Sequence, residues 1–235
     1  MNNEQKENLD LDVEILSEKI KNYDISFKII LIGDSKVGKS SLILKATKNI
    51  FQQECITTAG FDFFNFQMKI KEKTINLQIW DTGGQEAYRS LITNFYRNSS
   101  LAILVYSIDN KESFISLNDW VKQIKTYSSP DIKIFIIGNK NDLDNERKIS
   151  YEEGEQFYKI NGFNKFFETS AKSGFNTKEM FIEAGKMLYD NYIKINKKGN
   201  LMNLNENDLI EKQRKFLKRF NEDEDNKGNT NYSCC

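Results

Sequence analysis

The chain of 235 residues has a hydrophobic content of 39%, which is enough for one domain with a well-filled core and short appendages. Its 34 lysine and arginine residues balance 34 aspartate and glutamate residues, so no overall charge attracts it to nucleic acid and we expect no such partner. The lack of histidine excludes the usual zinc ligand sets and histidine-dependent nucleophile pairs, and three cysteines are too few for a disulfide framework.

The first predicted element is an N-terminal extension, residues 1–26. It lacks the basic start and apolar run of a secretory signal, and no later apolar run is long enough to span a bilayer. We therefore expect a reducing, cytosolic compartment. Leu9, Val13, Leu16 and Ile20 lie at helical spacing, so a short helix is one alternative, but the acidic and amide residues around them favour a mostly flexible arm.

Apolar and amphipathic segments alternate through the rest of the chain. Strands are predicted at residues 27–33, 61–70, 74–80, 101–107, 132–138 and 165–169. Helices are predicted at residues 39–48, 112–127 and 151–162. One face of a last helix is marked by Met180, Phe181, Ala184, Met187, Leu188 and Tyr192. Residues 196–235 are rich in Asn, Lys, Glu and Asp, which predicts a flexible tail after a domain of residues 27–195.

The spacing of the strands predicts an α/β fold with a doubly wound, mostly parallel six-stranded sheet. Only "KEK" separates the second and third strands, so these two should form an antiparallel hairpin that gives the sheet one antiparallel edge strand. The later gaps are long enough for helical crossovers between parallel strands. In such sheets ligands bind beyond the carboxyl ends of the strands.

Residues 33–40, "GDSKVGKS", follow the first of these strands and fit the pattern G-x-x-x-x-G-K-[ST]; we call them the phosphate loop. Glycines let the backbone curl its N–H groups around phosphate oxygens, while Lys39 can reach the outer phosphates and Ser40 can hold Mg²⁺. A tight strand-to-helix turn without a ligand is the alternative. The position between a buried strand and a helix favours phosphate binding.

Three further motifs follow other strands. "WDTGGQE" (80–86) places Asp81 to hold Mg²⁺ through water and Gly83 to approach a terminal phosphate. "GNKNDL" (138–143) and "ETSAK" (168–172) come after the last two strands. Asp142 can accept hydrogen bonds from both the ring N–H and the exocyclic amine of guanine, whereas adenine offers no such pair of donors. The predicted base is guanine.

With these motifs in order, residues 27–195 resemble a small GTPase of the Ras superfamily, and specifically the Rab family. The resemblance implies a P-loop NTPase fold, GTP and GDP as ligands, Mg²⁺ as cofactor, and Gln85 and Lys39 as catalytic residues. The metal ligands it implies are Ser40, Thr58 and Asp81. The nucleotide-binding residues it implies are Ser35, Lys36, Val37, Gly38, Lys39, Ser40, Ser41, Phe51, Thr58, Gly83, Asn139, Lys140, Asp142, Ser170, Ala171 and Lys172.

The Rab assignment depends on less universal marks. "AGFDFF" (59–64), "NLQIWDTGGQE" (76–86) and "FYRNS" (95–99) resemble the Rab stretches around the two switches. Phe63, Trp80 and Phe95 occupy the positions where Rabs expose an aromatic triad to effectors. The alternative is that these aromatic residues pack the hairpin against the second switch, and both roles are compatible.

Three residues depart from the family pattern. Lys36 stands where the family usually has a small residue, and it either adds a cation near the phosphates or points to solvent. Gly84 replaces the usual alanine before Gln85, which loosens the backbone there. Ala87 lacks a side chain that partners could contact. These departures affect the expected hydrolysis rate and the choice of regulators, not the reaction class.

The resemblance also implies a function and a set of partners. We expect slow GTP hydrolysis, with fast hydrolysis requiring an arginine from a GTPase-activating protein. Other expected partners are an exchange factor, a GDP-dissociation inhibitor, a prenylation escort protein and effectors in vesicle traffic. The protein is expected to be a monomer. The terminal Cys234 and Cys235 resemble a site for two geranylgeranyl groups, which would hold the protein on the cytoplasmic face of an intracellular membrane, cycling with the cytosol.

Two other functions stay open at this point. One is a module that holds guanine nucleotide with little turnover, suggested by Lys36 and Gly84. The other is a soluble small GTPase of a signalling or nuclear-transport type, against which the two terminal cysteines argue. A basic, amphipathic stretch at residues 207–220 could rest on an anionic membrane, or serve as a solvated spacer.

Overall fold

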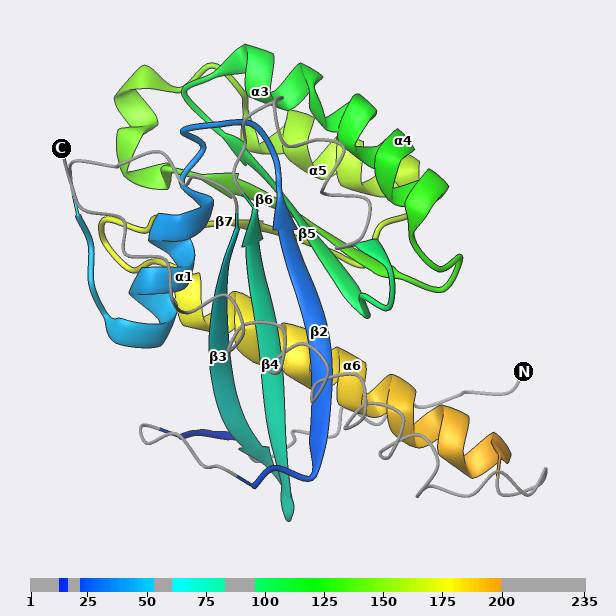
Figure 1. Cartoon of the computed structure of the whole chain (residues 1–235). Coiled ribbons are helices and arrows are strands. Elements are labelled where there is room, and N and C mark those ends of the chain that lie inside the picture. The colour runs from blue at the N-terminus through cyan, green and yellow to red at the C-terminus, as the bar shows by residue number, and fades with distance from the viewer. Residues whose placement is uncertain (1–12, 17–21, 53–60, 83–95, 200–235) are drawn as a thin grey trace, which may run out of the picture. The chain divides into compact units, whose positions relative to one another are not determined.

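The computed structural model describes residues 13–16, 22–52, 61–82 and 96–199 (Figure 1). Its strands are β1 (Val13–Ile15), β2 (Ile25–Ile32), β3 (Phe61–Ile70), β4 (Lys73–Thr82), β5 (Leu101–Ser107), β6 (Lys133–Asn139) and β7 (Lys165–Glu168). Its helices are α1 (Lys39–Lys48), α3 (Lys111–Ile115), α4 (Leu117–Tyr127), a 3₁₀ helix at Asn141–Glu146, α5 (Tyr151–Asn161) and α6 (Thr177–Gly199). Among the described residues, no helix combines the length and apolar character needed to cross a bilayer.

The strands form one sheet in the order β1-β3-β4-β2-β5-β6-β7. Neighbours from β4 to β7 are parallel, whereas β3 pairs antiparallel with β4, from Phe61 opposite Thr82 to Ile70 opposite Lys73. The four strands β2, β5, β6 and β4 are almost entirely buried, as strands covered on both faces should be. The predicted α/β fold with a mostly parallel sheet and an antiparallel edge is confirmed.

The sheet has a seventh strand, β1, which the sequence analysis did not identify. Val13 pairs with Ile70 and Ile15 with Met68, antiparallel, at the outer edge of β3. This segment forms a strand because an apolar edge with unpaired backbone groups is available beside it, whereas the sequence analysis considered only a flexible arm or a helix. The strand β2 also begins two residues earlier than predicted, at Ile25.

The two faces of the sheet carry separate sets of helices. On one face, even-numbered strand residues such as Ile30 and Leu104 pack in a buried cluster with Trp120 and Ile124 of α4. On the other face, the ring of Phe66 in β3 lies 5.4 Å from that of Phe181 in α6. Figure 1 shows α3, α4 and α5 together on one side of the sheet. The predicted site residues follow the carboxyl ends of the parallel strands, where ligands bind in such sheets.

Local sequence explains where the helices begin and end. The helix α5 starts with a capping box in which Ser150 accepts from the backbone N–H of Glu153 and the Glu153 carboxylate accepts from that of Ser150. It ends at Gly162 in the left-handed conformation that favours glycine. The predicted helix at 112–127 is divided into α3 and α4 at Ser116, and α6 continues to Gly199, past the predicted boundary at residue 195.

Candidate nucleotide-binding site

The phosphate loop connects β2 to α1 and requires glycine at both of its ends. Gly33 has φ +140°, and a Cβ atom there would lie 2.2 Å from the carbonyl oxygen of Val105 in β5. Gly38 has φ +94°, and its Cβ would lie 2.4 Å from Nδ2 of Asn139. The loop is therefore pressed against the ends of β5 and β6, in a backbone conformation that only glycine adopts without strain.

The Lys39 ammonium lies within the phosphate loop and is almost fully buried. Its Nζ donates to the carbonyl oxygens of Gly33 (2.9 Å) and Asp34 (2.8 Å). Burial lowers the pKa of Lys39 to about 8, although the nearby carboxylates of Asp81 and Asp34 act in the opposite direction. A desolvated cation held by neutral carbonyl groups would gain from a phosphate ligand, since charge-assisted hydrogen bonds are the stronger ones.

Ser40 and Asp81 form the adjoining oxygen-rich site. The Ser40 hydroxyl donates to Oδ2 of Asp81, and the side chain of Asp81 has no solvent exposure. Within the described part of the chain, Oδ1 of Asp81 has no hydrogen-bond partner. Burial raises the pKa of Asp81 to about 6, with the Ser40 hydroxyl and Lys39 lowering it. A buried carboxylate with an unused oxygen beside a hydroxyl fits a Mg²⁺ ion, which prefers oxygen ligands and keeps a carboxylate ionised.

Asn139, at the end of β6, ties the phosphate loop to the predicted guanine loops. Its Nδ2 donates to the carbonyl oxygen of Val37 (2.8 Å), and its Oδ1 accepts from the hydroxyl of Thr169 (3.2 Å). The side chain is almost fully buried. The sequence predicts Asn139 as a guanine contact, and the structure shows its amide joining the phosphate loop to the segment of Thr169.

The two predicted guanine loops meet beside this brace. Oδ1 of Asp142 accepts from the hydroxyl of Ser170 (2.6 Å), and the Lys172 ammonium lies 3.9 Å from Oδ2 of Asp142. The Lys140 ammonium lies 3.4 Å from Oδ2 of Asp109. Ala171 is buried. The structure thus brings the residues of "NKND" and "SAK" to one place, next to the phosphate loop.

The remaining predicted residues lie either inside or outside the described parts of the chain. Ser35 is half-buried, and Val37 and Ser41 are buried. Phe51, predicted to stack on the base, is 39% exposed, and Lys36 is exposed with φ +64°, a conformation unusual for a lysine. The predictions outside the described residues are Thr58, Gly83, Gln85, Phe95, Cys234 and Cys235. For these six residues the structure provides no test.

Three aromatic residues of the hairpin lie together near the end of β4. The ring of Phe63 lies 5.3 Å from that of Trp80, edge to face, and Phe61 lies 5.7 Å from Trp80. Phe61 and Phe63 are each 44% exposed, whereas Trp80 is buried and has the Lys28 ammonium 5.1 Å from its ring. Phe63 and Trp80 were predicted from the sequence, whereas Phe61 was not, although it stands two residues before Phe63 in "AGFDFF".

One support of the phosphate loop could not be identified from the sequence. Nε1 of Trp120 in α4 donates to Oδ1 of Asp34 across 86 positions of sequence (2.8 Å). In the sequence, Trp120 is one of several apolar residues on the buried face of a helix, so nothing distinguishes it from an ordinary core residue.

Comparisons with known proteins agree with this geometry. The Ras family model matches residues 28–190. The chain is 44% identical to Ras-related protein Rab-3C of Bos taurus over 161 residues, which are 68% of this chain and 70% of that relative. It is 41% identical to Ras-related protein Rab-8 of Diplobatis ommata over 191 residues, 81% of this chain and 87% of the relative. The chain therefore belongs to the Ras family of small GTPases, and within that family it is a Rab protein.

Proposed function

We propose that this chain is a membrane-anchored Rab switch that binds GTP and GDP with Mg²⁺, hydrolyses GTP slowly, and recruits effectors in vesicle traffic while GTP is bound. One observation carries the proposal. Lys39, Ser40 and Asp81 lie together at the carboxyl ends of β2 and β4, and the Asn139 amide joins their loop to the guanine loops. This arrangement supports binding of a nucleotide along the strand ends, with phosphates at one end and guanine at the other.

In the proposed reaction, water attacks the terminal phosphate in line with the leaving oxygen. The Lys39 ammonium gives up its hydrogen bonds to the loop carbonyl oxygens and donates to the outer phosphate oxygens. The backbone N–H groups of the phosphate loop stabilise negative charge on the remaining phosphate oxygens. Ser40 and Asp81, with Thr58, would hold Mg²⁺, which when bound supplies positive charge at these oxygens. Gln85 orients the water, and we assign no arginine of this chain to the reaction. Hydrolysis is therefore slow until an activating protein contributes an arginine.

The proposed output is a change of shape that partners detect. Thr58 and Gly83 hold the switches only while the terminal phosphate is present, so hydrolysis releases them. While GTP is bound, effectors contact the aromatic surface of Phe63, Trp80 and Phe95. The exposed ring of Phe63 against buried Trp80 supports this role, since clustered aromatic residues are typical of interface centres. An exchange factor and a GDP-dissociation inhibitor complete the cycle.

Replacing Gln85 with leucine should slow hydrolysis of bound GTP by about ten- to a hundredfold, because the attacking water loses its orienting group. Single-turnover hydrolysis of preloaded GTP measures this rate, and GDP affinity should stay unchanged. Gln156→Leu is the matched control, because Gln156 is exposed on α5, and should hydrolyse like the wild type. Equal rates for all three proteins would contradict the reaction and favour a nucleotide-holding module with little turnover.

The membrane part of the proposal depends on Cys234 and Cys235. Two geranylgeranyl thioethers would give stable anchoring, whereas one lipid chain gives marginal, reversible binding. The neutral overall charge of the chain provides no general electrostatic attraction to an anionic membrane. A prenylation escort protein would present these cysteines for modification, and the cytoplasmic face of an intracellular membrane is the resulting location.

We expect an N-terminally tagged wild type to mark a discrete compartment in its own cell type, and the double variant Cys234→Ser, Cys235→Ser to be diffuse. Live-cell imaging measures this difference. The control Cys55→Ser removes the other thiol of the chain and should leave the localisation unchanged. Diffuse wild-type protein, with no lipid mass on its C-terminal peptide, would reject the anchor and favour a soluble GTPase.

A further inference from the structure

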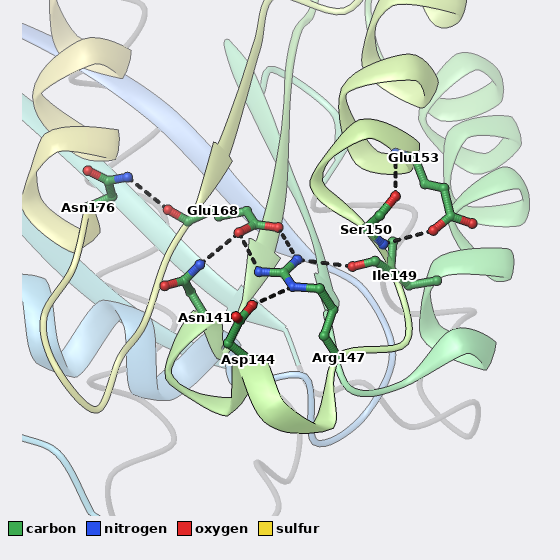
Figure 2. Close-up of polar contacts among 8 residues, drawn as sticks. All are labelled: Asn141, Asp144, Arg147, Ile149, Ser150, Glu153, Glu168 and Asn176. Carbon is green, nitrogen blue, oxygen red and sulfur yellow. Dashed lines mark hydrogen bonds and ion pairs between the residues drawn. The ribbon is translucent and has the colours of Figure 1, made fainter.

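A network of polar contacts around one buried carboxylate joins the two guanine loops (Figure 2). At its centre is Glu168, the last residue of β7, which is only 6% exposed. Its carboxylate accepts two hydrogen bonds from Arg147, Nη1 to Oε1 (2.6 Å) and Nη2 to Oε2 (2.9 Å). Oε2 also accepts from Nδ2 of Asn141 (2.7 Å). A buried carboxylate needs such partners, because an uncompensated charge there is strongly destabilising.

Arg147 is itself fixed on several sides. Its Nε donates to Oδ1 of Asp144 (2.7 Å) and its Nη1 to the carbonyl oxygen of Ile149 (3.0 Å), as Figure 2 shows. The hydrogen bond to Glu168 is the main cause that raises the pKa of Arg147, so the guanidinium stays charged. Arg147 therefore compensates the charge of Glu168. The neutral amide of Asn141 is not needed for this compensation, so its contact with Glu168 has another role.

Asn141 occupies the position between Lys140 and Asp142, the residues proposed to bind guanine. Its backbone N–H donates to the carbonyl oxygen of Thr169 (2.9 Å), and its side chain reaches Glu168 in the same segment. Asn176 also holds the start of this segment, since its Nδ2 donates to the carbonyl oxygen of Glu168 (2.9 Å). Asn141 thus links the loop of Asp142 to the segment that leads into Ser170.

We propose that Asn141 is a positioning residue for guanine recognition: by binding Glu168 it fixes the loop that aims the Asp142 carboxylate, without touching the nucleotide. This inference rests on the proposed guanine pocket. Guanine has an exocyclic amine that hypoxanthine lacks. In the proposed pocket this amine donates a hydrogen bond to the Asp142 carboxylate. A site built around such a donor loses selectivity when the acceptor is displaced. Loss of the hydrogen bond from Asn141 to Glu168 should therefore weaken binding of GDP more than binding of IDP.

The test compares Asn141→Ala with Asn145→Ala, since Asn145 is exposed on the same 3₁₀ helix. Dissociation constants for GDP and IDP, each with Mg²⁺, are measured on the full chain by titration calorimetry. Asn141→Ala should lower the ratio of GDP affinity to IDP affinity by about tenfold, which corresponds to the net contribution of one hydrogen bond. Asn145→Ala should keep the wild-type ratio. Asn141→Asp should lower it further, since it places a second carboxylate against Glu168.

The ratio of GDP affinity to IDP affinity shows whether Asn141 positions Asp142 or only stabilises the fold. Arg147 still compensates Glu168 in Asn141→Ala, so the fold should persist, and a urea titration checks this. Equal losses of GDP and IDP affinity, or an unchanged ratio, would overturn the inference and leave the proposed function intact. A wild type that binds GDP and IDP equally would overturn the guanine pocket itself, and the positioning role with it.

Discussion

The variant Gly33→Ala is expected to lose about 4 kcal/mol or more of its free energy of unfolding. An added Cβ would lie 2.2 Å from the carbonyl oxygen of Val105, and the obstacle is the backbone of a central strand that cannot rotate away. The φ of +140° adds a backbone conformation that an alanine rarely adopts. Urea unfolding of nucleotide-free protein, followed by circular dichroism, measures the loss.

Gly162→Ala is the matched control for this prediction. Gly162 also has a positive φ, +64°, but a Cβ there would have no atom within 4 Å. Its replacement should therefore cost only the left-handed backbone penalty, about 1–2 kcal/mol. If the two variants lost the same stability, the close contact between the phosphate loop and β5 would not be the reason for Gly33.

The variant Lys39→Ala should bind GDP about a hundred- to a thousandfold more weakly than the wild type. Lys39 is the buried cation of the phosphate loop, and removing one partner of a buried charged contact usually costs about 2–5 kcal/mol. The variant also leaves the carbonyl oxygens of Gly33 and Asp34 without their donor, so a modest loss of stability should accompany it. Titration calorimetry with GDP and Mg²⁺ measures the affinity.

Lys48→Ala tests whether the effect belongs to the position and not to the charge. Lys48 is exposed at the end of the same helix, α1, so its removal changes the net charge equally. Its GDP affinity should stay close to that of the wild type. A similar loss in both variants would mean that general electrostatic attraction, and not the geometry of the phosphate loop, determines the affinity.

The parts of the fold that the sequence predicts well are those in which local pattern and burial agree. The strand Ile25–Ile32, the phosphate loop and the helix Lys39–Lys48 follow one another within 24 residues, and each has its own signal in composition or motif. The hairpin of β3 and β4 is equally local, because two turn residues join its strands. For such elements the neighbours in sequence are also the neighbours in space.

The parts that could not be predicted depend on residues far apart in the chain. Val13 forms a strand because Ile70 lies beside it, 57 positions later, and three residues of sequence carry no comparable signal. Nothing in the sequence of "NKND" assigns a contact to Asn141, and only the fold brings Glu168 to its side-chain amide. The same holds for Trp120 and Asp34. Such pairings are a property of the topology rather than of the local pattern.

The pairing of β1 with the far end of β3 makes the N-terminal strand a convenient place for a spectroscopic reporter. Glu14 is exposed and lies opposite Lys69. The ribbon from Ile70 back to Phe61 spans nine residue steps, or roughly 30 Å at the usual rise of a strand. A dye at residue 14 would thus be attached to the same hairpin as Phe61 and Phe63, at the opposite end of β3.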